Sequence, residues 1–486
     1  MKERQQKISY SHILKYTGLF GGVQVLCLLV GMVRNKLAAW LLGPTGIGLI
    51  SLFNSTIKLI FDSTNLGFPM SAVRNISEAY EEGDTKRLKT LIATVRLWGV
   101  ITAIAGMVVC IAVSPLLNTW TFSWGKHTLH YLFLSPIVGL MALTGIETAI
   151  LKGTRRLRDL ATMSVINAFL TLLTAIPLYW FLGLKGIIPS LFLAALAQML
   201  ITIYYSYKYF PLQIHYDMSY VKGGMGMVKL GIAFVLAGIL GSGAEFIIRS
   251  FLNFSVNTDV LGYYNAGYMI AISYASMVFT AMETDYFPRL SAVQNNYVAR
   301  NQMVNRQMEV SMLIVAPMVV GLLIGLPFIV PLLYSRMFMP TIEMVQVSVL
   351  SLYLRSMTLP MSYMTLAKGD SLAYLFLEAV YDVVVVILVI WGIQEKGLFG
   401  AGLGLLAASV IDVIVIYCFV NRKYGYRMSR GMRHVALIHI PIGLLAFGIT
   451  RCFDGAIYWV AGIALTIVNA LLSYYQYNKR KRLAKA

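Results

Sequence analysis

Long apolar runs constrain this chain more than any other feature of its sequence. Each run is long enough to cross a hydrocarbon core of ~30 Å, which takes about 20 helical residues. Charged residues make up only 13% of the 486 residues, about half their share in soluble domains. A β-barrel would instead need alternating segments of about 10 residues. The sequence therefore predicts an all-α polytopic membrane protein with about 14 transmembrane helices. The predicted spans are 12–42, 46–73, 88–116, 128–151, 160–182, 186–208, 225–252, 261–288, 306–333, 342–366, 371–392, 398–420, 434–451 and 456–477.

Basic residues between these runs predict the orientation of the chain. Alternate connections carry most of the lysines and arginines behind the net charge of +19, and both termini fall on the basic side. By the positive-inside rule, the N- and C-termini are cytoplasmic. Because topology explains the basic excess, nucleic acid is not predicted as a partner.

Short motifs of the first half return in the second half in the same order, at an almost constant offset. The pairs are LGPTGIG (42–48) with LGYYNAG (261–267), FPMSAVRN (68–75) with FPRLSAVQN (287–295), AILKG (149–153) with MTLAKG (364–369), and LKGIIPS (184–190) with LFGAGLG (398–404). We therefore expect two parallel six-helix repeats that form a V-shaped pair of lobes, with two extra C-terminal helices. The predicted parts are an N-lobe at 1–215, a C-lobe at 216–425, and the last two spans with a basic cytoplasmic tail at 426–486.

Charged side chains inside the spans are the candidate functional residues, because each costs roughly 2.5–3.5 kcal/mol at the membrane centre. Asn54, Lys58 and Asp62 recur every fourth residue, which places them on one helix face. We expect this face to line a hydrated cavity, although Lys58 and Asp62 could simply pair with each other. The other candidate cations of the cavity are Arg34, which could instead be an interfacial anchor, Arg249 and Arg355.

Acids inside the spans are candidates for ion coupling or for permanent charge pairing. They are Asp62, Glu245, Glu378, Asp382 and Asp412. Burial raises a carboxylate pKa toward neutrality, so any of them could carry a coupling proton. Each could equally be the partner of Arg355 or another cation. The repeat places Gln198 at the position that Asp412 occupies in the second copy.

No motif of a known enzyme class occurs in the sequence. HExxH, GxSxG and P-loop patterns are missing, and the four cysteines form no CxxC pair. We therefore predict neither catalytic residues nor a metal site, and no cofactor beyond coupling to an H+ or Na+ gradient.

The stretches GPTGIGLISL (43–52), LKGTRRLRDLA (151–161) and LAKGDSLAYLFLEAV (366–380) carry a family resemblance. With the six-plus-six repeat, they resemble the Wzx-type O-antigen and repeat-unit flippases of the multidrug/oligosaccharidyl-lipid/polysaccharide (MOP) exporter superfamily. The resemblance implies transfer of an undecaprenyl-diphosphate-linked oligosaccharide from the cytoplasmic to the outer leaflet of the bacterial inner membrane. It implies alternating access, with the headgroup in a cationic cavity between the lobes.

The same resemblance assigns cavity positions. In the related lipid II flippases, arginines of the first two spans line the cavity; Arg34 matches one, and Lys58 stands near the other. Lysine keeps the positive charge but lacks the planar guanidinium that binds phosphate through two hydrogen bonds. The implied partners are the lipid bilayer, the polyprenyl-diphosphate-linked glycan, and polysaccharide polymerases and glycosyltransferases. The family also raises the question whether the last two spans hold the lipid tail.

Two alternatives stay open, and a third is disfavoured by the sequence. One is a flippase for lipid II or another peptidoglycan precursor. Another is a multidrug cation antiporter, which should have a cavity dominated by acids. A polysaccharide polymerase or ligase would need a large external loop, and no connection in this sequence is that long.

Overall fold

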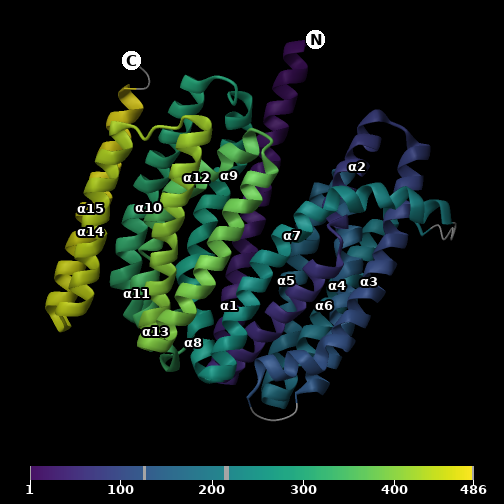
Figure 1. Cartoon of the computed structure of the whole chain (residues 1–486), viewed down its shortest axis with the longest axis horizontal. Helices are drawn as coiled ribbons and strands as arrows, with labels where there is room; N and C mark the ends of the chain where they lie inside the picture. The colour runs from purple at the N-terminus through teal and green to yellow at the C-terminus, as the bar shows by residue number, and fades with distance from the viewer. Residues whose placement is uncertain (1, 124–126, 213–217, 484–486) are drawn as a thin grey trace. The chain divides into compact units, whose positions relative to one another are not determined.

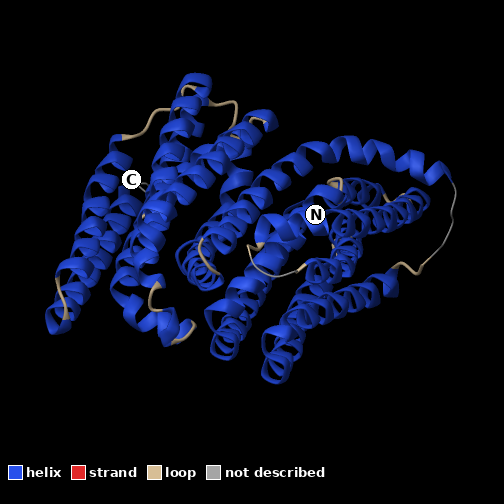
Figure 2. Ribbon diagram, turned by 60° about the horizontal axis from the view of Figure 1, so that its bottom comes forward, coloured by secondary structure: helices blue, strands red, loops and turns tan. Residues whose placement is uncertain are grey.

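The computed structural model describes residues 2–123, 127–212 and 218–483, and every element of regular secondary structure within these ranges is a helix (Figures 1 and 2). The predicted all-α fold is confirmed. The elements are α1 (Lys2–Thr64), α2 (Phe68–Glu82), α3 (Thr85–Thr121), α4 (Thr128–Gly153), α5 (Leu157–Leu182), the 3-10 turn η1 (Gly183–Gly186), α6 (Ile187–Tyr209), α7 (Met218–Ser255), α8 (Thr258–Tyr268), the π-helical turn η2 (Met269–Tyr274), α9 (Ala275–Ala292), α10 (Tyr297–Leu333), the 3-10 turn η3 (Arg336–Phe338), α11 (Thr341–Ser348), α12 (Ser351–Ala367), α13 (Ser371–Tyr424), α14 (Arg430–Cys452) and α15 (Gly455–Leu483).

Eight ranges of the described residues are long and apolar enough to cross a membrane. They are Gly22–Thr64, Thr85–Thr121, Thr128–Gly153, Leu157–Tyr209, Tyr297–Leu333, Ser371–Tyr424, Arg430–Cys452 and Gly455–Arg480. The fourth and sixth each contain two predicted spans, and the first overlaps two, 12–42 and 46–73. The remaining predicted spans lie on α7, on α8 with α9, and on α11 with α12. The chain is thus a multi-pass membrane protein; the number of 14 spans and the cytoplasmic termini stay predictions.

α1 and α13 each consist of two helices that meet at a glycine kink. Gly43 in α1 has φ 64° and ψ −167°, and Pro44 follows it. Gly397 in α13 has φ 57° and ψ −138°. Positive φ of this kind strains every residue with a Cβ, so glycine is required at both kinks. The kinks fall where the sequence predicted a turn between two spans.

The predicted span 46–73 is wrong in one respect, because the helix breaks at its end. α1 stops at Thr64, and α2 starts at Phe68 after Leu66 and Gly67, which have φ of 54° and 62°. The Asn65 side chain accepts a hydrogen bond from the Gly67 amide at 2.7 Å. This local bond stabilises the turn that redirects the chain.

The chain forms two compact units, Met1–Leu261 and Gly262–Ala486. In the first unit, α1 packs against α5 and α7, α3 against α4 and α7, and α4 against α2 and α6. The repeat had assigned α7 to the second copy, yet α7 packs on α1, α2 and α3. The lobe boundaries 1–215, 216–425 and 426–486 stay predictions.

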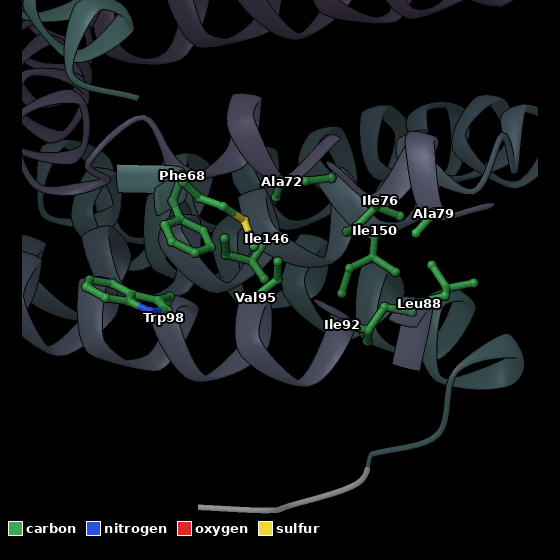
Figure 3. Packing of buried hydrophobic residues seen from close by; sticks show 12 residues of the cluster. Phe68, Ala72, Ile76, Ala79, Leu88, Ile92, Val95, Trp98, Ile146 and Ile150 are labelled. Carbon is green, nitrogen blue, oxygen red and sulfur yellow. The ribbon is translucent and has the colours of Figure 1, made fainter. Parts of the chain in front are cut away.

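An apolar cluster fixes α2 on α3 and α4 in the first unit (Figure 3). Phe68, Ala72 and Ile76 recur every fourth residue and are fully buried, so they form one face of α2. The Phe68 ring stacks on Trp98 of α3, with ring centroids 5.4 Å apart. Burying a Phe or Ile side chain contributes about 1.5–3 kcal/mol. The cluster therefore anchors the chain directly after the end of α1.

In the second unit, α10 is the central helix. It packs against α9, α11, α12, α14 and α15, while α13 packs against α11 and α12. Gly443 lets α14 approach α12 closely, because a Cβ there would lie 2.5 Å from the Tyr353 ring. Tyr353 in turn donates a hydrogen bond to the carbonyl of Ala316 on α10 at 3.4 Å.

Candidate functional site

A network of charges joins α1 to α7 in the first unit. Lys58 Nζ lies 3.2 Å from Glu245 Oε1, and Arg249 Nη1 lies 2.8 Å from Glu245 Oε2. One carboxylate therefore serves two cations. The Lys58 side chain is 50% exposed, whereas that of Arg249 is only 10% exposed. The predicted pair of Glu245 and Arg249 forms, and Lys58 joins it from another helix.

Asp62 belongs to the same network. It lies within electrostatic range of both Lys58 and Glu245. Gly238 of α7 lies beside it, since a Cβ at that glycine would be in ordinary contact with the Asp62 side chain, at 3.5 Å. Asn54, one turn before Lys58, is exposed. The polar face of α1 is thus real, but the ion pair of Lys58 is with Glu245 of α7.

Arg34 lies elsewhere in the same unit, at a cavity of about 400 Å³ enclosed by α1, α4, α5 and α6. The polar residues that line this cavity with it are Gln24, Thr148, Ser164, Asn167, Thr171, Gln198 and Thr202. Among the described lining residues, Arg34 carries the only charge. The Asn167 Oδ1 atom is buried without a hydrogen-bond partner in the described structure. The cavity therefore offers a cation and neutral hydrogen-bonding groups.

The second unit contains a cavity of about 240 Å³ that mixes charges of both signs. Arg355 of α12, Glu378 and Tyr381 of α13, and Asp412 further along α13 line it. Arg355 is within electrostatic range of Glu378 and of Asp412. The arginine thus has carboxylates on another helix, one of the arrangements that the sequence left open.

Asp382 differs from Glu378 and Asp412 in its position relative to the cavity of the second unit. Asp382, four residues after Glu378, is not among the residues that line the cavity of the second unit; it interacts electrostatically with Tyr381. Gln198 and Asp412, which the repeat equates, each line the cavity of their own unit. The equivalence of these two positions in the repeat stays a prediction.

Sequence reasoning missed a buried ion pair between α3 and α4. Arg96 Nε and Nη2 donate to the two oxygens of Glu147 at 2.8 and 3.1 Å. Both side chains are under 10% exposed. Ser206 Oγ donates to the same carboxylate at 2.5 Å, and Arg96 also donates to the carbonyl of Phe210 at 2.8 Å. The sequence did carry a signal for this pair, because Arg96 lies inside the apolar run 88–116 and Glu147 inside the apolar run 128–151.

Comparison with known proteins places the chain in a family. A family model described as polysaccharide biosynthesis protein matches residues 37–343, more than half of the chain. The chain belongs to this polysaccharide biosynthesis protein family. A comparison with curated proteins gave no match.

Solved structures show which fold this family member has. An inward-facing multidrug resistance MATE family transporter of the MOP superfamily superposes with a TM-score of 0.73, at 13% identity over 87% of this chain and 99% of that chain. The lipid II flippase MurJ, in an inward closed conformation, gives 0.71 at 15% identity over 95% and 99%. A MOP superfamily transporter from Pyrococcus furiosus gives 0.58 at 13% identity over 84% and 94%. The polysaccharide biosynthesis protein therefore has the fold of MOP-superfamily transporters, which confirms the predicted fold class.

Proposed function

We propose that this protein is a flippase for a lipid-linked oligosaccharide repeat unit, and that it moves the diphosphate-bearing headgroup across the membrane by alternating access. The expected carrier lipid is undecaprenyl diphosphate, and the expected site is the cytoplasmic membrane of a bacterium. Family membership supports a role in polysaccharide biosynthesis, and the fold is one that a lipid II flippase also has.

The observation that carries the proposal is the charge of the cavity in the first unit. Arg34 lines it together with amides and hydroxyls, and no carboxylate is among its described lining residues. A diphosphate faces a large desolvation barrier in hydrocarbon. Hydrogen bonds to a charged group contribute about 1.5–3 kcal/mol each. A guanidinium beside hydroxyl and amide groups therefore suits a phosphorylated, hydroxyl-rich headgroup.

The network around Lys58 supplies a second place for phosphate. Glu245 holds both Lys58 and Arg249, yet half of the Lys58 side chain is exposed. An incoming phosphate can replace the carboxylate as the partner of Lys58, while Arg249 keeps Glu245. Lys58 would thereby exchange one anion for another without a stage at which its charge is unpaired.

The acids of the second unit suit ion coupling rather than headgroup binding. Arg355 faces two carboxylates, Glu378 and Asp412, so this cavity holds one acid more than its cation can neutralise. A proton or a sodium ion can balance the extra charge. Coupling of transport to an H+ or Na+ gradient is therefore part of the proposal.

Two rival functions are weighed against specific observations. A peptidoglycan-precursor flippase is favoured by the match to the lipid II flippase, which covers 95% of this chain against 87% for the MATE transporter. The Arg34 cavity, whose described lining lacks acids, argues against a multidrug cation antiporter, whereas Glu378 and Asp412 in the cavity of the second unit argue for one. For the Pyrococcus furiosus transporter, reversed polarity of the binding pocket is itself said to suggest a different function.

The test is flipping by the purified full chain in liposomes that contain a fluorescent undecaprenyl-diphosphate oligosaccharide. Accessibility of the label to an impermeant quencher reports the rate. Arg34→Gln should slow flipping about tenfold, the effect of losing one charge-assisted hydrogen bond. Arg336→Gln, which removes an exposed arginine of η3, is the matched control and should leave the rate unchanged.

The possible results separate the function from the site. If the wild-type chain flips the oligosaccharide no faster than empty liposomes do, the function is wrong. Flipping of lipid II alone would favour the peptidoglycan-precursor alternative. If wild type flips the oligosaccharide and Arg34→Gln matches it, the function stands and the assignment of Arg34 fails.

A further inference from the structure

A large cleft in the second unit lies apart from the two cavities described above. Its volume is about 990 Å³, and α9, α10, the segment before α14 and the end of α15 form its walls. The polar and charged residues that line it are Arg289, Asn301, Gln302, Asn305, Arg306, Gln307, Glu309, Ser429, Tyr477 and Arg480. The predicted topology places this end of the unit at the cytoplasmic surface.

The one carboxylate among these lining residues is already neutralised. Glu309 pairs with Arg480 and accepts a hydrogen bond from Ser429 Oγ at 3.0 Å. Arg480 also donates to the carbonyl of Gly431 at 3.0 Å, and a Cβ at Gly431 would come within 2.5 Å of Glu309 Oε1. α14 is therefore packed directly on the ion pair. These contacts connect α10, α14 and α15 along this wall of the cleft.

The cleft keeps an excess of positive charge after this pairing. Arg306 has an exposed side chain, and no described carboxylate lies within ion-pair distance of it. Arg289 also lines the cleft. Arg306 thus offers a guanidinium that no described carboxylate neutralises, beside the amide side chains of Gln302 and Gln307, and this indicates an external anionic ligand.

The two main walls change from polar to apolar in the same direction. Along α10, Gln302 and Arg306 are followed toward the membrane interior by Val310 and Leu313. On α15, which runs the opposite way by the predicted topology, Tyr477 precedes Arg480 by one turn. Tyrosine is enriched at membrane interfaces, and basic residues at the cytoplasmic surface attract anionic lipids.

We infer that this cleft binds a phospholipid of the cytoplasmic leaflet with a net negative headgroup. Arg306 and the amide side chains beside it receive the phosphate, and Val310 and Leu313 contact the first part of the acyl chains. Basic pockets between transmembrane helices at the cytoplasmic side are a known mode of binding such headgroups. The bound lipid connects α10 to α15, and this role is independent of the flipping proposed above.

The experiment measures lipid retained by the purified full chain. Native mass spectrometry of the protein in detergent, titrated with phosphatidylglycerol, gives an apparent affinity, and phosphatidylcholine is the zwitterionic comparison. Wild type should prefer phosphatidylglycerol. Arg306→Gln should weaken its binding about fivefold, the effect of one basic residue at an anionic surface, and Arg306→Lys should restore most of it. Arg422→Gln removes another exposed cation of the same unit and should have no effect.

Three results would overturn the inference. The first is equal retention of the two lipids by wild type. The second is equal binding by the Arg306→Gln and Arg422→Gln variants, which would mean that general surface charge holds the lipid. The third is complete displacement of phosphatidylglycerol by millimolar inorganic phosphate, which would identify a site for free anions and exclude a lipid site.

Discussion

Removing one partner of the buried Arg96–Glu147 pair should destabilise the first unit strongly. In Glu147→Ala, Arg96 keeps the carbonyls of Phe210 and Pro211, at 2.8 and 3.2 Å, but loses both carboxylate contacts. Ser206 loses its 2.5 Å acceptor as well. A buried charge left without its partner costs about 3–5 kcal/mol. Because Glu147 accepts three hydrogen bonds, we expect a loss near the upper end of this range.

Unfolding in detergent by added sodium dodecyl sulfate measures this loss, with tryptophan fluorescence as the signal. Trp98 is a suitable reporter, because it lies half a turn from Arg96 and stacks on Phe68. Replacing both charges, as in Arg96→Leu with Glu147→Leu, should recover most of the stability, since a buried pair contributes little over an apolar replacement. A loss below about 1 kcal/mol in Glu147→Ala, or a double variant as unstable as the single one, would refute this reasoning.

The remaining predictions concern charges near the functional site and at one helix start. Lys58→Arg should keep flipping near the wild-type rate, whereas Lys58→Ala should slow it about tenfold in the liposome assay; total loss in Lys58→Arg would point to a steric role. Glu245→Gln removes the anion that competes for Lys58, so binding of the phosphorylated substrate should tighten, as measured by fluorescence titration. Hydrogen bonds from Lys423 and Tyr424 hold the pKa of Asp370, which caps α13 outside the membrane spans, below its usual 3.8. The stability it contributes is present above pH 3.8 and is lost as pH falls from there through the depressed pKa. In Asp370→Asn, the free energy of unfolding should depend less on pH in this acidic range. The same pH dependence as in wild type would contradict the role given to Asp370.

The helices were predictable because their signals are local. Apolar runs, Gly43 with Pro44, and Gly397 all act within a few residues of their position. The break after Thr64 was not predictable in this way. It places Leu66, a residue that seldom adopts positive φ, in the left-handed region, and the packing of α2 through Phe68 holds it there.

The charged residues were found from the sequence, but their partners were not. Lys58 has an acid four residues away, and local reasoning pairs it with Asp62. The packing of α1 on α7 instead brings Glu245 to within 3.2 Å. Arg96 and Glu147 escaped notice for the same reason, because neither has an opposite charge one turn away in its own helix. Tertiary packing creates such pairs, so a single sequence does not reveal them.

Exposure distinguishes the two kinds of charge in the first unit. Arg96 and Glu147 are almost fully buried, and hydrogen bonds to Ser206 and to backbone carbonyls complete their pairing. A substrate has no room to compete there, so the pair serves packing. Lys58 has half of its side chain exposed and shares its carboxylate with Arg249. The coupling energy of an exposed pair is typically 0.2–1 kcal/mol, small enough for a phosphate to replace it. A charge inside the membrane is available to a substrate only where its ion pair on the protein is this weak. A double-mutant cycle on Lys58 and Glu245 measures the coupling energy of their pair. A coupling energy of several kcal/mol would mean that Lys58 has a structural role.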